Sequence, residues 1–143
     1  MTITVEEYFG PWRYTPAAND VVMENAEAFL PKANSLLAYY EQQTGNKVKS
    51  NPVTSNAMHS YDEVAGNTFG GFRPPECPQG AKDSSHKQGR GVDVYDPDNA
   101  IDKWITDEIL AMFGLYREHP DKTVGWCHLT DRSPPSGHRT FMP

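Results

Sequence analysis

Residue types that bind metals occur in two segments that lie far apart in the chain. Residues 84–93 contain His86 and Asp93, and residues 126–128 end in His128. Two imidazoles and one carboxylate suit Zn²⁺, and three protein ligands leave the fourth tetrahedral position for water. The sequence therefore predicts a fold that brings both segments to one zinc ion, with His86, Asp93 and His128 as its ligands.

The residues around these ligands predict strands rather than a helix. Two glycines separate the first two ligands, and each would cost a helix about 1 kcal/mol relative to alanine. β-Branched valines flank Asp93, so residues 91–95 are predicted to form a strand with Asp93 on one face and apolar side chains on the other. The same alternation places Trp126 and His128 on one face and turns Cys127 toward the core.

A first helix is predicted from apolar residues at spacings of three and four. It begins at Asp20, which we expect to be its cap, and ends at Gly45. Pro31 within it either kinks the helix or begins a new one. Short strands are also predicted at residues 48–55 and 69–72.

A second helix is predicted to begin at a cap formed by Asp98 or Asn99 and to end at Gly114. Its acidic residues, expected on the solvent face, are Asp102, Asp107 and Glu108. The aromatic-rich segment 8–14 is expected to cover an edge of the core, with the lining of a groove as the alternative. The twelve prolines and eleven glycines indicate long loops between few elements.

Composition limits the class of protein. The length of 143 residues fits one domain, with residues 1–19 as an N-terminal extension and residues 48–143 bearing the site. A net charge of −6 without a basic stripe argues against nucleic-acid binding. We expect no membrane span and no signal peptide, because the N-terminus has no basic start and no apolar centre. Two cysteines fit a reducing compartment, and we expect a monomer made in a bacterial cytoplasm.

The pattern S-x-H-x-x-G-x-G-x-D at residues 84–93, together with W-x-H at 126–128, resembles the superfamily of zinc D-alanyl-D-alanine carboxypeptidases (VanY-type) and Hedgehog domains. Gly91 replaces the usual alanine. The resemblance covers roughly residues 52–143, and the tail resembles a short phage and prophage branch. It implies zinc ligation by His86, Asp93 and His128, and an α+β fold of the Hedgehog/DD-peptidase type. That fold is loop-rich, with a small antiparallel sheet and flanking helices.

Further site residues follow from the same resemblance. Residues 71–75 resemble the segment S-G-[YF]-R-[SP], with Gly71 in place of serine, and imply that Arg73 faces the active site and stabilises substrate carbonyl or oxyanion charge. Ser84 is the motif serine near the metal. We assign Ser84, Arg73 and Trp126 to substrate binding.

The sequence departs from the family at one catalytic position. Many members place a glutamate three residues before the last histidine, and here that residue is Gly125. Peptide hydrolysis on zinc requires a group that takes the proton from water and passes it to the leaving amine. We favour Glu118 for this role, although a solvated loop glutamate is its ordinary alternative. The other candidates are His119, Asp131 and His138.

The resemblance implies a zinc peptidase that cleaves bacterial peptidoglycan stem peptides as a D-Ala-D-Ala carboxypeptidase or an L-Ala-D-Glu endopeptidase. It also implies a phage or prophage protein that acts on the cell wall after release or within a particle. Two alternatives remain open. One is a non-catalytic zinc module that recognises a wall peptide or a partner protein, and the other is a structural component of a phage particle.

Overall fold

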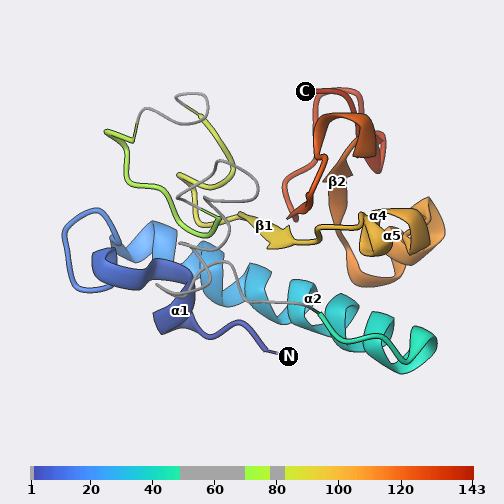
Figure 1. The fold of residues 1–143 in the computed structure, drawn as a ribbon. Coiled ribbons are helices and arrows are strands. Elements are labelled where there is room, and N and C mark those ends of the chain that lie inside the picture. Colours follow the sequence, from blue (N-terminus) through green and yellow to red (C-terminus); the bar gives the residue numbers. More distant parts are fainter. Residues whose placement is uncertain (1, 49–69, 78–82) are drawn as a thin grey trace.

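The structure is a computed structural model that describes residues 2–48, 70–77 and 83–143. Helices and a four-stranded sheet form a mixed α+β fold, as predicted (Figure 1). The predicted strand at 48–55 lies outside the described residues except for Val48, which is not in a strand. Residues 70–72 of the predicted strand 69–72 form no strand either, although the Phe72 amide donates to the Tyr8 carbonyl at 3.0 Å.

The long helix α2, Asp20–Thr44, supports the molecule along one side. Its cap is Asn19 rather than the predicted Asp20, because the Asn19 side chain accepts from the Val22 amide at 3.0 Å. Pro31 lies inside the helix without ending it, and Gly45 ends the helix at φ 73°, as predicted. The buried face consists of Val22, Ala26, Phe29, Leu30, Ala33, Leu36, Leu37 and Tyr40.

The N-terminal segment contributes to the same core. It forms helix α1, Val5–Phe9, followed by the 3₁₀ turn η1, Gly10–Trp12. Tyr8 and Phe9 are buried, and the Phe9 ring lies 4.9 Å from the Phe72 ring between centroids. The expectation that this aromatic segment covers the core is confirmed for these two side chains, whereas Tyr14 is 85% exposed.

The sheet has the strand order β1-β3-β2-β4. The strands are β1, Gly91–Tyr95; β2, Tyr116–Glu118; β3, Trp126–Thr130; and β4, Thr140–Phe141. β3 pairs antiparallel with β1 and β2, but β4 pairs parallel with β2, so the sheet is not wholly antiparallel. The difference arises because the chain leaves β3 through a long loop and returns along the outer edge of β2.

The predicted second helix is two helices, α4, Ala100–Trp104, and α5, Asp107–Phe113. The helix breaks at Thr106, whose hydroxyl accepts from the Ile109 amide at 3.2 Å and caps α5. Gly114 ends α5 as predicted. Asn99, one of the two predicted caps, occupies the N-cap position of α4 but makes no side-chain cap hydrogen bond. The carboxylate of Asp96 instead accepts from the amides of Ile101 and Asp102 at 3.1–3.2 Å.

The expectation that Asp102 faces solvent is wrong. Asp102 is 2% exposed, its carboxylate accepts from the Thr123 hydroxyl at 2.9 Å, and its backbone carbonyl accepts from Arg117 at 2.6 Å. Asp107 and Glu108 are exposed, as predicted. α4 packs against β3, and Asp102 lies on the side of the helix that faces Arg117 of β2 and Thr123.

One hydrophobic cluster joins α1, α2, the short helices and the inner face of the sheet. α2 packs against α5 and β3, and Figure 1 shows it passing below β1. Within the described part of the chain, no helix combines the length and apolar character that crossing a membrane would require.

Candidate metal centre

The three predicted ligands lie together in the structure. His86 is in the turn that precedes β1, Asp93 is in β1 and His128 is in β3. One potential ligand atom from each lies within 4.8 Å of the others, and the three residues are only 3–7% exposed. Their convergence agrees with the sequence prediction of one metal site built from two distant segments.

The sheet brings two of the ligands together. Asp93 is the antiparallel register partner of His128, so both side chains project from the same face. On the opposite face, Val92, Val94 and Cys127 are buried in the core. The prediction that Cys127 is a core thiol is confirmed, and burial raises the pKa of that thiol well above its ordinary value.

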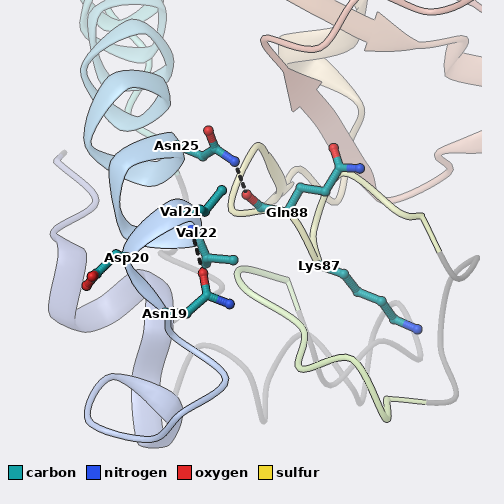
Figure 2. Close-up of a pocket in the computed structure, with 7 residues that line it drawn as sticks. All are labelled: Asn19, Asp20, Val21, Val22, Asn25, Lys87 and Gln88. Carbon is teal, nitrogen blue, oxygen red and sulfur yellow. Dashed lines mark hydrogen bonds between the residues drawn. The ribbon is translucent and has the colours of Figure 1, made fainter.

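The turn that carries His86 is held against the N-terminal end of α2. The Asn25 side chain donates to the Gln88 carbonyl at 2.9 Å, as Figure 2 shows, while Lys87 points away from the helix. Gly89 has a φ of 74°, and a Cβ there would lie 2.6 Å from the Val22 carbonyl oxygen. Glycine therefore allows the turn to approach α2 closely enough to set the position of His86.

The hydrogen bonds of His86 define which nitrogen could bind a metal. Its Nδ1 lies 2.8 Å from the Gly71 carbonyl oxygen, and a carbonyl only accepts, so Nδ1 carries the proton. Burial lowers the pKa of His86 despite the opposing effect of Asp93, which leaves the ring neutral at pH 7. The lone pair of Nε2 then faces Asp93 Oδ1 at 3.2 Å. Two lone pairs that face each other in a buried site repel each other, and a cation bound between them would remove that repulsion.

Asp93 is ionised and held in place from both sides. Burial opposes its ionisation, but the charge and hydrogen bonds that the two histidines supply when they are protonated outweigh that effect and lower the pKa of the carboxyl below its usual range. Oδ1 lies 2.8 Å from His128 Nδ1, and Oδ2 accepts from Arg73 Nη2 at 3.1 Å. A neutral histidine, an ionised carboxylate and a second imidazole form a donor set that suits Zn²⁺.

Arg73 lies in the site that the sequence analysis predicted for it. Its side chain is 8% exposed and pairs with the ligand carboxylate of Asp93, and its amide donates to the His86 carbonyl at 3.2 Å. The structure thus adds a role that the sequence analysis did not assign, because the guanidinium orients the carboxylate of a candidate metal ligand.

Glu118 is the candidate base that the sheet carries to the metal ligands. The paired residues of β2 and β3 are Tyr116 with Thr130 and Arg117 with Leu129, and continuing this register by one residue sets Glu118 opposite His128. Asp93, His128 and Glu118 therefore form one row across β1, β3 and β2. Glu118 is half-buried, and burial raises its pKa, as does the charge of Asp93, while His128 and Arg73 oppose the shift.

The other three candidate bases have different surroundings. The Nδ1 of His119 accepts from the Asp121 amide at 3.1 Å and caps the 3₁₀ turn η2, Pro120–Lys122. Asp131 pairs with Arg90 at 2.7 Å and with Lys32 at 3.7 Å. His138 is exposed in the loop before β4. Of the four, Glu118 alone belongs to the row that contains two of the ligands.

A groove of about 740 Å³ opens beside the ligands. Ser85 from the turn before β1 lines it together with His128 and Thr130 of β3. Its other lining residues are Asp83, 132–136 and 141–143. The three residues assigned to substrate binding, Ser84, Arg73 and Trp126, are not among the described residues that line it. The Ser84 hydroxyl instead accepts from the His86 amide at 3.2 Å and stabilises the ligand turn.

Sequence reasoning missed two buried residues next to the site. The Tyr8 hydroxyl donates to the Gly91 carbonyl at 2.7 Å, and burial raises the pKa of that phenol. Ser85 Oγ lies 3.4 Å from His128 Nε2. No motif contains Tyr8, and Ser85 stands at the unspecified position of the S-x-H pattern.

Comparisons with models of protein families, with curated proteins and with solved structures find no match to this chain. The description of the site therefore rests on the residues and geometry above. What the geometry defines is a buried cluster of two histidines and one aspartate that could hold a metal ion at the base of a groove.

Proposed function

We propose that this protein is a zinc-dependent peptidase that acts on bacterial cell-wall peptides. The observation that carries the proposal is the convergence of His86, Asp93 and His128 in one buried cluster. The unprotonated Nε2 of His86 and the ionised Asp93 face each other, which supports a bound cation. Two imidazoles and one carboxylate are a ligand set found in zinc hydrolases.

The chemistry of hydrolysis is divided between the metal and the side chains. When bound, Zn²⁺ supplies Lewis acidity, which activates water near neutral pH. Glu118 accepts the proton from the attacking water and delivers it to the leaving amine. Its raised pKa suits both steps, since a base close to the working pH can accept and release a proton. Arg73 orients Asp93 and places positive charge beside the reacting carbonyl.

The groove supports a peptide as the substrate. Its lining includes His128 and Ser85 at the site together with residues of the C-terminal segment, where prolines, Phe141 and Met142 occur beside Arg132, Ser133 and Ser136. A mixed lining of this kind contacts both the apolar and the polar parts of an extended peptide. The substrate class, a peptidoglycan stem peptide, and an origin in a phage or prophage come from the motif resemblance.

The first test is to incubate the zinc-loaded protein with purified peptidoglycan and with a pentapeptide that ends in D-Ala-D-Ala. Mass spectrometry would identify the products. We expect release of D-Ala or a split stem peptide, loss of this activity in His128→Ala, and a loss of about 10²–10⁴-fold in Glu118→Gln. Asp121→Asn, a change of an exposed carboxylate outside the row, is the matched control and should retain activity.

A non-catalytic zinc module is the second candidate, because Gly125 occupies the position of the family's glutamate. Stoichiometric zinc binding without cleavage of either substrate would favour this candidate over the peptidase. Cleavage that persists unchanged in Glu118→Gln would retain the peptidase but remove Glu118 as its base.

A further inference from the structure

Ser85 lies behind the ligand histidine of β3. It is 5% exposed, and its Oγ is 3.4 Å from Nε2 of His128, the ring nitrogen opposite the one that faces Asp93. Ser85 also lies at the end of the groove next to His128. A buried hydroxyl at this position contacts the imidazole without competing for the metal-facing nitrogen.

The backbone of β1 leaves room for this hydroxyl. A Cβ built on Gly91 would approach Ser85 Oγ more closely than real Cβ atoms approach any neighbour, and it would lie 3.1 Å from Ser85 Cβ and 3.2 Å from the His86 amide nitrogen. The missing side chain at position 91 is therefore the space that the Ser85 hydroxyl fills. Because any side chain at position 91 would collide with this hydroxyl, Ser85 and Gly91 form a matched pair.

We propose that Ser85 is a positioning residue for the metal site, which fixes the ring of His128, and that Gly91 is required to accommodate it. The inference rests on the proposed zinc site. If Nδ1 of His128 binds the metal, the ring proton is on Nε2, and Nε2 then donates to Ser85 Oγ. Without a metal, Nδ1 donates to Asp93 Oδ1 and the Ser85 hydroxyl donates to Nε2. A hydroxyl both donates and accepts, so it partners His128 in either state.

The test measures zinc affinity by competition with a chromophoric chelator, and stability by urea unfolding without metal. Ser85→Ala should weaken zinc binding about 10-fold or more, because outer partners of ligand histidines contribute that much to affinity. Ser35→Ala, which removes an exposed hydroxyl from α2, is the matched control and should bind zinc like the parent.

Gly91→Ala separates the steric role from the hydrogen-bonding role. It should lower both stability and zinc affinity, since the new methyl displaces the Ser85 hydroxyl. Adding Ser85→Ala to it should recover part of the stability but none of the zinc affinity. Zinc binding by Ser85→Ala that equals the parent's would overturn the inference. Failure of the parent itself to bind zinc would instead overturn the proposed function.

Discussion

At the scale of single residues, three aspartates of one short region have three different roles. Asp93 is a candidate ligand, Asp96 caps a helix, and Asp102 is buried against Arg117 and Thr123. The sequence pattern distinguished only the first, because a motif surrounds it. Burial and hydrogen-bond partners decide the other two roles.

Asp102→Ala should lower the free energy of unfolding by about 3–5 kcal/mol, since it leaves the buried guanidinium of Arg117 without its carboxylate. Glu108→Ala, on the exposed side of α5, is the control and should change stability by about 0.5 kcal/mol or less. Urea unfolding at pH 7 measures both. Equal effects of the two substitutions would contradict the assigned burial of Asp102.

At the scale of elements, the site depends on how short helices and turns hold the strands. Asn99 shows this for the approach to β3: its side chain donates to the Thr123 carbonyl at 2.8 Å and accepts from the Gly125 amide at 3.0 Å. The turn that leads into Trp126 and His128 is thus attached to the start of α4. The sequence indicated Asn99 as a cap, but the side chain binds a distant turn that no local pattern could specify.

The cap of α4 gives a prediction about pH. Burial raises the pKa of Asp96 above 3.8, although the amides of Ile101 and Asp102 oppose the shift. The Asp96 carboxyl therefore binds its proton more tightly in the folded state than in the unfolded state. The contribution of Asp96 to stability falls as pH rises from 3.8 through the folded pKa, because the carboxyl loses that proton. Asp96→Asn keeps the cap without the charge, so its stability relative to the parent should improve between pH 3.5 and pH 7.

Urea unfolding of the parent and Asp96→Asn at several pH values between these limits tests the prediction. Asp96→Ala is the control for the cap itself: it lacks the same carboxyl, so it should follow the pH trend of Asp96→Asn and lie about 1 kcal/mol below it at either limit. A relative stability of Asp96→Asn that falls toward pH 7 would show that the charge stabilises the folded state.

At the scale of the whole molecule, the sequence predicted the ligands, β1, the long helix and its end, because short motifs and local periodicity determine them. It did not predict the parallel strand β4 or the break between α4 and α5, which depend on contacts between segments distant in the chain. The row of Asp93, His128 and Glu118 also required the β2–β3 register. Residue types suggested Glu118 as the base, but only the pairing of strands places it beside a ligand.

The same architecture predicts how zinc binding and folding are coupled. One hydrophobic cluster spans α1, α2 and the sheet without using the ligands, so the protein treated with a chelator should remain folded and unfold cooperatively. Zinc that binds only the assembled site should stabilise the folded protein by about 2.7 kcal/mol when the free zinc concentration is 100 times the dissociation constant. Calorimetry with and without zinc should show this as a rise in Tm, which His128→Ala should remove. An equal rise in that variant would place the zinc elsewhere in the chain.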